Sequence, residues 1–403
     1  MTHHPTPVLL LLCLLLLVAC DDFFGKKTDT EFLDEPVFED QTVAYVPIQP
    51  VIDGFSYPVD VIAGFDQLIY VADQGTEEIV SFDQAGNELG RFRVQGLRGI
   101  AQDRRLDLIA VGTRDTTVSS TNFTLPAIYR IDLNKSGTYG LANASVKKII
   151  THPFYFKSGT PTASDVAVSF QDIAIWPDNR FYVTRNGPSN VSTQFGGPDD
   201  AVLLFGNDDR FISPVFVSTT LGLFTDYFKK PSGIATFATA PQSLELNNPS
   251  LTPPGDFYFT SISPQNVLKV QRIGFVQSDF GSSYNLVILA AGDTSRADRF
   301  LYEANRFEEP ADITIAGDGT RYVFVIDAVK DSLYQFNAQG LEGVNPPSGA
   351  GTSKAILASF GGRGQGLRQF NEPRGVAYLD RIVYVADAGN GRVLRFKLTT
   401  DFE

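Results

Sequence analysis

Histidine, cysteine and positive charge are all scarce in this sequence. Its 403 residues include three histidines and two cysteines, and 33 Lys and Arg stand against 46 Asp and Glu, a formal net charge of −13. Two cysteines exclude a disulfide-based scaffold. Because both kinds of site need histidine, a histidine-ligated catalytic zinc and a serine–histidine nucleophile are disfavoured. The acidic balance excludes the basic face that a nucleic-acid partner requires.

Long apolar runs are absent except near the N-terminus. Residues 8–19 are almost entirely apolar, which is too short to span a bilayer but suits the apolar region of a secretory signal. The run ends with the sequence LVAC at residues 17–20, which resembles the lipobox of bacterial lipoproteins. This resemblance implies cleavage before Cys20, acylation of Cys20 and anchoring in a lipid bilayer. An ordinary signal peptide cut near Ala19 is the alternative.

The segment after Cys20 is strongly acidic. Residues 21–41 hold eight acidic side chains against Lys26 and Lys27, so the segment buries little and should stay extended. We therefore predict a signal peptide at 1–19, a lipidated cysteine with a flexible tether at 20–41, and one folded domain at 42–403. The first acidic residues resemble surface-export signals of some lipoproteins and an inner-membrane retention signal of enteric bacteria. We favour the outer membrane of a bacterial envelope.

One three-strand pattern recurs six times after residue 43. Each copy opens with a short strand, often of the form Pro-x-Gly/Asp-apolar, continues with an apolar strand ending near Asp, and closes with an alternating strand. The openings of the six copies lie at residues 58–62, 97–101, 171–174, 231–235, 310–314 and 373–377. The second, third and fourth copies are degenerate, and we place the later strands of the fourth at 256–260 and 266–270.

These repeats resemble the NHL-repeat family, most closely at residues 361–396, where the sequence GGRGQGLRQFNEP precedes the last copy. The resemblance implies an all-β, six-bladed β-propeller with four-stranded blades. A ring of blades buries both faces of each small sheet, which one unit cannot do alone. The last copy leaves no room for a fourth strand. We therefore predict that a strand at about 43–48 pairs in the last blade and closes the ring.

Aspartates recur at the third position of the opening motif. Asp60, Asp172 and Asp312 occupy it on alternate blades, so they should surround the channel axis. Three carboxylates with waters suit Ca²⁺, and some propellers similar to this family are lactonases or lyases with a metal in the channel. The alternative is structural, since Asp side chains readily bond local backbone N–H groups. The one histidine outside the leader, His152, should lie at the surface or in a loop.

Binding residues are expected at the channel mouth and on the loops of one face. Arg98 and Arg374 occupy the second motif position, and Arg forks suit carboxylates or phosphates. Insertions at 113–126 and 185–200 and the connection 293–309 should lie on one face. The connection carries Arg and aromatic residues typical of interfaces: Arg296, Arg299, Phe300 and Tyr302.

The sequence therefore favours a membrane-anchored envelope lipoprotein whose propeller binds a protein or cell-surface ligand through this face. A Ca²⁺-dependent lactonase-like or lyase-like enzyme centred on the three aspartates is the alternative. A purely structural envelope component is a third possibility. Binding is favoured over catalysis, and no cofactor other than Ca²⁺ is indicated.

Overall fold

The computed structural model describes residues 43–401 except 136, 157, 192–196, 220, 221, 225, 239–254, 280 and 347–351. The predicted signal peptide, Cys20 and the tether lie outside the described residues. Among the described residues, no helix combines the length and apolar character needed to cross a membrane.

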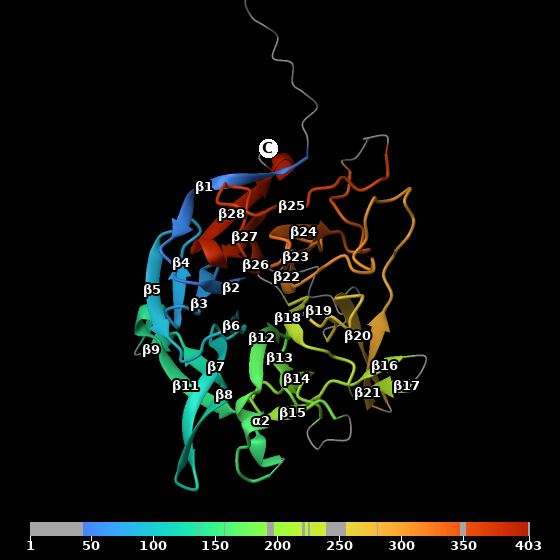
Figure 1. The fold of residues 1–403 in the computed structure, drawn as a ribbon. Helices are drawn as coiled ribbons and strands as arrows, with labels where there is room; N and C mark the ends of the chain where they lie inside the picture. The colour runs from blue at the N-terminus through green and yellow to red at the C-terminus, as the bar shows by residue number, and fades with distance from the viewer. Residues whose placement is uncertain are drawn as a thin grey trace, which may run out of the picture. The chain divides into compact units, whose positions relative to one another are not determined.

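Six sheets form a ring in which each sheet is one blade (Figure 1). The strands of each blade, from the channel outward, are as follows: blade 1, β2 (Pro58–Ala63), β3 (Ile69–Asp73), β4 (Glu78–Phe82) and β5 (Glu88–Arg93); blade 2, β6 (Gly99–Gln102), β7 (Leu108–Val118), β8 (Thr121–Asp132) and β11 (Ser145–Thr151); blade 3, β12 (Ser169–Ile175), β13 (Phe181–Asn186), β14 (Ala201–Phe205) and β15 (Phe211–Pro214); blade 4, β18 (Pro231–Thr236), β19 (Phe257–Ser261), β20 (Val270–Ser278) and β21 (Gly281–Val287); blade 5, β22 (Pro310–Ile315), β23 (Val323–Asp327), β24 (Ser332–Phe336) and β25 (Phe360–Gly361); blade 6, β26 (Pro373–Leu379), β27 (Ile382–Asp387), β28 (Arg392–Leu398) and β1 (Tyr45–Asp53).

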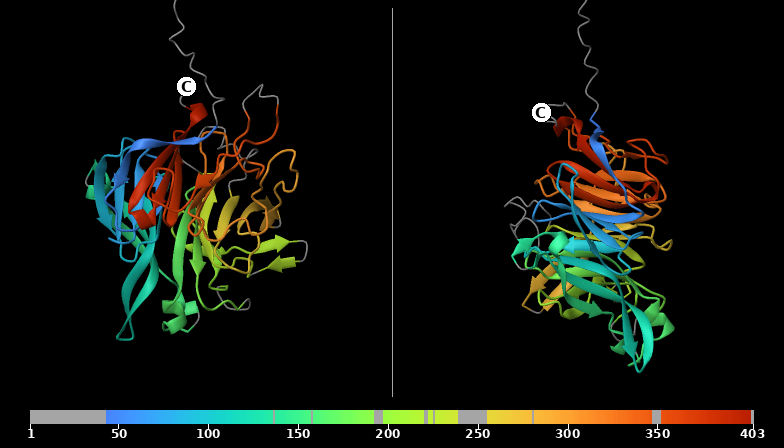
Figure 2. Two further views of the ribbon diagram at one scale, coloured as in Figure 1. Left: turned by 45° about the horizontal axis from the view of Figure 1, so that its top comes forward. Right: turned by 90° about the vertical axis from the view of Figure 1, so that its left-hand side faces the viewer.

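The ring is closed by the first strand of the described chain. β1 pairs antiparallel with β28, and the register places Tyr45 opposite Leu398 and Ile52 opposite Val393. The predicted closure is confirmed, with a strand that runs from Tyr45 to Asp53 and so extends beyond the expected residues 43–48. The first and last strands of the ring thus share one blade, as their colours show in Figure 2.

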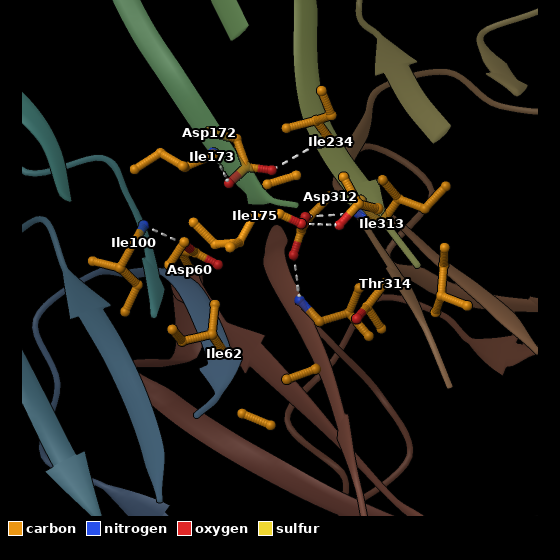
Figure 3. Close-up of a pocket in the computed structure, with 18 of the residues that line it drawn as sticks. Asp60, Ile62, Ile100, Asp172, Ile173, Ile175, Ile234, Asp312, Ile313 and Thr314 are labelled. Atoms are coloured by element: carbon orange, nitrogen blue, oxygen red, sulfur yellow. Dashed lines mark hydrogen bonds between the residues drawn. The ribbon is translucent and has the colours of Figure 1, made fainter. Parts of the chain in front are cut away.

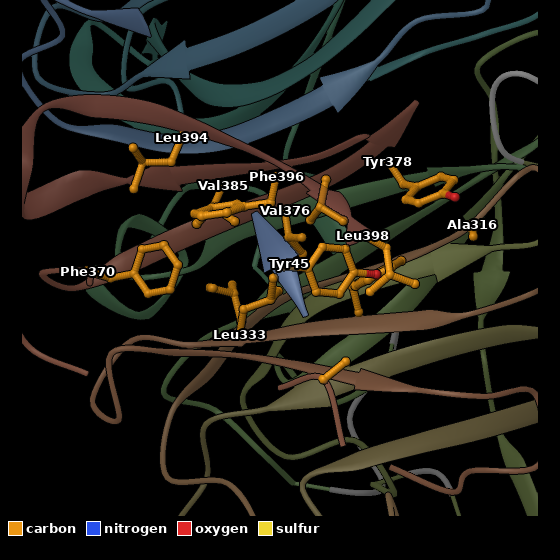
Figure 4. Packing of buried hydrophobic residues seen from close by; sticks show 14 of the residues in the cluster. Tyr45, Ala316, Leu333, Phe370, Val376, Tyr378, Val385, Leu394, Phe396 and Leu398 are labelled. Carbon is orange, nitrogen blue, oxygen red and sulfur yellow. The ribbon is translucent and has the colours of Figure 1, made fainter. Parts of the chain in front are cut away.

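The core lies between the blades, because each strand in the middle of a blade buries both of its faces. Every residue of β3, β19 and β23 is buried. Between blades 5 and 6, Tyr45 and Leu398 pack with Phe324, Phe370 and Phe396 (Figure 4). Closing the ring is therefore coupled to filling the core, since Tyr45 comes from β1.

The aspartates that end the second strands organise the turns, as the repeat pattern predicts. Asp327 accepts backbone N–H bonds from Val329 and Lys330 in the turn after β23. It also accepts the N–H groups of Glu308 and Glu309 in the connection that enters its blade. One buried carboxylate thus fixes two loops, which accounts for its regular recurrence at Asp73, Asp327 and Asp387.

Two expectations about the irregular blades were wrong, and blade 4 carries two strands beyond its four. The third strand of blade 4 begins at Val270 and does not occupy residues 266–270. The expected loop at 113–126 is a hairpin of β7 and β8, whose turn residues Ser119 and Ser120 both have positive φ. The blade 4 sheet gains β16 (Val217–Thr219), parallel to β21, and β17 (Gly222–Phe224).

His152 lies in the loop after β11, as expected, but it is buried and not at the surface. It is 2% exposed, and its Nε2 atom lies 3.6 Å from Oδ1 of Asp165. Asp165 belongs to α2 (Ala163–Val166), a short helix with a capping box between Thr162 and Asp165. The insertion between β11 and β12 thus folds back over His152. The residue does not line the central channel.

Candidate binding site at the channel mouth

The inner strands of all six blades begin at the same face and enclose a central channel. A cavity of about 300 Å³ opens at this face. All six residues at the second motif position line it, together with loop residues that the repeat pattern does not mark: Val59, Arg98, Gln171, Ser232, Ala311 and Arg374 from the motif, and Tyr57, Gln74 and Ile262 from the loops. A smaller, more apolar cavity of about 110 Å³ lies farther along the inner strands.

The three predicted aspartates lie where these two cavities meet. Asp60, Asp172 and Asp312 line both of them, and Figure 3 shows the three carboxylates around the channel among isoleucine side chains. The prediction that alternate blades bring these residues to the axis is therefore confirmed.

Each of these aspartates links its own blade to the next. Asp60 Oδ2 accepts the N–H of Ile100 at 2.8 Å, and Asp172 Oδ2 accepts the N–H of Ile234 at 2.7 Å. Asp312 Oδ2 completes the series with the N–H of Val376 at 2.7 Å. The carboxylates thus serve as three cross-links between blades 1 and 2, 3 and 4, and 5 and 6.

The glycines at the same motif position explain why the aspartates alternate. A Cβ atom on Gly375 would lie 2.7 Å from Cα of Asp60, and one on Gly233 would lie 2.8 Å from Cα of Asp312. A Cβ atom on Gly99 would lie 2.6 Å from the carbonyl oxygen of Gln171. Glycine therefore permits each aspartate strand to approach the preceding blade closely enough to close the ring.

Burial dominates the electrostatics of the three carboxyls. It raises the pKa of Asp60 to about 7, against N–H bonds from Ile100 and Val61 that lower it. Burial also raises the pKa values of Asp172 and Asp312 well above the ordinary range, and the charges of the neighbouring aspartates add to the rise. The channel therefore favours protonated carboxyls at this level.

Calcium binding by the three aspartates stays a prediction. Among the described residues, no group of three or more His, Cys, Asp or Glu side chains is arranged to hold a metal ion. One oxygen of each carboxylate is already used by the next blade. These three hydrogen bonds account for the aspartates as links between blades, a role that requires no ion.

The two arginines of the mouth differ in their surroundings. Arg374 Nη1 lies 2.9 Å from Oε1 of Glu309, and its Nη2 donates to Glu372, so its charge is compensated. Arg98 has no ion pair or side-chain hydrogen bond within the described part of the chain. It keeps an exposed face at the mouth, while the channel wall removes water from it and lowers its pKa. Arg98 is therefore the cation available to a ligand.

The predicted aromatic patch on the connection 293–309 is not exposed, which corrects the expectation. Phe300 is 6% exposed and packs with Leu341, from the long insertion that follows β24. Tyr302 is partly buried, and its hydroxyl donates to the carbonyl oxygen of Val287 at 2.7 Å. The blade 5 insertion covers this connection, so its aromatic residues belong to the core.

The arginines of the same connection remain at the surface. Arg299 Nη1 pairs with Glu303 Oε1 at 2.8 Å, and Arg296 is exposed. Neither lines the channel mouth. Of the six predicted binding residues, the structure therefore brings only Arg98 and Arg374 together.

Comparisons with known proteins agree with this architecture. Residues 370–396 match the family model described as the NHL repeat. No match to the sequence was found among curated proteins. The chain is thus a six-bladed β-propeller that carries an NHL repeat in its last blade.

Solved structures share the fold at low sequence identity. A luciferin-regenerating enzyme has a TM-score of 0.50 and 11% identity, with 88% of this chain and 95% of that chain covered. The PQQ-bound aldose sugar dehydrogenase from Streptomyces coelicolor has a TM-score of 0.50 and 14% identity, with coverages of 89% and 98%. An auxiliary nutrient binding protein from Bacteroides thetaiotaomicron has a TM-score of 0.48 and 11% identity, with coverages of 86% and 70%. At these identities the likeness establishes the fold alone.

Proposed function

We propose that this chain is a bacterial envelope lipoprotein whose propeller binds an acidic protein or cell-surface ligand at the channel mouth. The observation that carries the proposal is Arg98, an exposed residue without a side-chain partner among the described residues, which lines a cavity of about 300 Å³. A guanidinium at a partly desolvated rim suits a carboxylate or phosphate. Gln74, Gln171 and Ser232 add hydrogen-bonding groups for neighbouring hydroxyls or amides.

The hairpin of β7 and β8 extends this binding face. β7 runs toward the face of the channel mouth and continues past Gly112, where Thr113 donates its N–H to the carbonyl oxygen of Gln95. The hairpin projects from the ring in Figure 1. Gln95 and Arg98 both belong to the connection between β5 and β6. A ligand at the mouth could therefore also contact the base of the hairpin.

Anchoring rests on the sequence resemblance at residues 17–20. Acylation of Cys20 would hold the propeller to a bilayer, with the outer membrane favoured. We expect the Cys20→Ala variant to move from the membrane fraction to the soluble fraction of the cells that make it. Recovery of this variant in the membrane fraction at the wild-type level would contradict the lipid anchor.

The mouth is tested with small carboxylates on the purified full-length protein. We expect glucuronate or N-acetylglutamate to bind saturably in isothermal titration calorimetry, and glucose, which has no charge, to bind at least tenfold more weakly. Glucuronate represents an acidic sugar of a glycan, and N-acetylglutamate represents an acidic residue of a protein. Arg98→Gln should weaken binding at least tenfold, since a charge-assisted bond contributes about 1.5–3 kcal/mol.

A matched arginine outside the site provides the control. Arg210 is highly exposed and pairs with Asp208 in the β14–β15 turn, so Arg210→Gln should leave the affinity unchanged. Arg98→Lys should retain part of the affinity, because it keeps the charge without the fork. Equal affinity in wild-type protein and Arg98→Gln would reject the proposed site.

A further inference from the structure

A second cavity lies where the ring closes, at the face opposite the channel mouth. β26 begins at the mouth with Arg374, whereas Tyr378 near its other end lines this cavity. The volume is about 320 Å³. The start of β1, the turns after β22 and β26 and the final 3₁₀ turn Thr399–Asp401 contribute its polar lining, which includes Tyr45, Asp318, Tyr322, Tyr378, Arg381 and Asp401.

Tyr45 buries its ring in the core and brings its hydroxyl to the wall of this cavity. The residue is 3% exposed, and its ring packs against Phe324 and Phe360 with centroid separations of 6.2 and 5.9 Å. Its hydroxyl makes no hydrogen bond within the part of the chain that the structure describes. Figure 4 shows the oxygen at the end of the ring nearer Leu398, which lines the same cavity. The hydroxyl is therefore open to the cavity and free to hydrogen-bond a ligand there.

The two carboxylates of the cavity are not equally satisfied. Asp318 accepts the hydroxyl of Tyr378 and the backbone N–H of Thr320. Within the described residues, Asp401 has one ion pair, with Arg381, whose Nη1 lies 3.9 Å from Oδ1. Its side chain is 25% exposed. Burial raises its pKa and the charge of Asp318 adds to the rise, while the charges of Arg381 and Lys397 lower it. Asp401 is therefore a partly desolvated carboxylate whose ion pair with Arg381 is long.

The chemistry of this lining favours one kind of ligand. Two carboxylates against one distant guanidinium disfavour an anion. A bare divalent cation is disfavoured, because among the described residues no group of three or more His, Cys, Asp or Glu side chains is arranged to hold a metal ion. Tyrosine rings and hydroxyls beside a carboxylate suit an organic cation, which gains both charge-assisted bonds and aromatic surroundings.

We propose that this cavity binds an organic ammonium ion, with Asp401 and the Tyr45 hydroxyl accepting its N–H groups. The site goes beyond the proposed function, since it lies at the other face and uses none of the mouth residues. An amino sugar and the aliphatic amine of a lysine-like side chain share this chemistry. The cavity volume admits either of them.

The test uses charged ligands and their neutral counterparts on the purified full-length protein. Glucosamine is compared with N-acetylglucosamine, and n-butylammonium with n-butanol, by isothermal titration calorimetry at neutral pH. We expect at least one amine to bind saturably, and its neutral counterpart at least tenfold more weakly. Binding of glucosamine alone identifies an amino sugar, and binding of n-butylammonium an aliphatic amine. Equal binding of charged and neutral compounds, or none, overturns the proposal.

Two variants place the binding in the cavity. Asp401→Asn should weaken the amine at least tenfold, and Tyr45→Phe, which keeps the ring in the core, should weaken it about threefold to fivefold. Asp380→Asn is the matched control, because Asp380 is exposed in the β26–β27 turn and does not line the cavity. Unchanged affinity in both Asp401→Asn and Tyr45→Phe, each shown by thermal melting to be folded, also overturns the proposal.

Discussion

A disulfide between positions 46 and 397 is expected to form readily and to raise the thermal stability of the propeller strongly. Val46 lies opposite Lys397 in the pairing of β1 with β28, and Val46 is partly exposed. Directly opposed residues in antiparallel strands have Cα separations of about 4.5–5.5 Å, within the range that a disulfide bridges. Because the bond closes nearly the whole propeller into one loop, the entropic limit of its stabilisation is about 6 kcal/mol.

The measurement compares the melting temperatures of the oxidised and reduced double variant Val46→Cys, Lys397→Cys, in a background in which Cys13 and Cys20 are replaced by Ser. A control pairs Val46→Cys with Arg91→Cys on β5, the outer strand of blade 1. The control should stay reduced, since β1 does not pair with that blade. Thiols at 46 and 397 that remain free under oxidising conditions would refute ring closure by β1.

Asp60→Asn is expected to stabilise the protein at pH 8 and to have little effect at pH 4. The folded-state pKa of Asp60 is raised from 3.8 to about 7. Between these values the unfolded chain has released the proton while the folded chain retains it, so rising pH favours unfolding. The stability attributable to the retained proton is present below pH 4 and is lost as the pH approaches 7, by about 2–4 kcal/mol. Asparagine removes this loss and can still accept the N–H of Ile100.

Thermal melts of both proteins at pH 4 and pH 8, in EDTA, measure this difference. We expect the variant to melt several degrees higher at pH 8, with the gap closing at pH 4. A variant that melts lower by the same amount at both pH values would show that the ionised carboxylate stabilises the ring. Repeating the pH 8 melts in millimolar Ca²⁺ tests the metal prediction, since a rise in wild type alone would establish calcium in the channel.

The repeat pattern was sufficient to predict the ring, because its signals are local and recur. Strands ending in Asp73, Asp327 and Asp387 could be predicted from alternation and turn chemistry, and the missing fourth strand of the last copy required a strand from elsewhere. Alternate Asp and Gly at the third position also placed Asp60 at the channel. Their cross-linking role depends on which backbone N–H of the next blade each carboxylate meets, and the sequence alone does not show this.

The insertions could not be predicted in the same way, because their surroundings come from distant parts of the chain. Phe300 and Tyr302 have the composition of an exposed interface, yet the insertion after β24 covers Phe300. His152 could be expected in a loop, but its burial beside Asp165 of α2 could not be predicted. Tyr45 could be predicted as part of the closing strand, but the cavity that it faces is formed by turns of blades 5 and 6.

The most direct test of the account is the position of a carboxylate in a crystal of this protein. Soaking crystals in bromoacetate and collecting anomalous diffraction at the bromine edge locates the bound acid without assumptions about its contacts. We predict anomalous density in the channel mouth, with the carboxylate within hydrogen-bond distance of Arg98, and its loss in crystals of Arg98→Gln. Bromine density only on the outer surface, or in the mouth of both proteins alike, would contradict binding through Arg98.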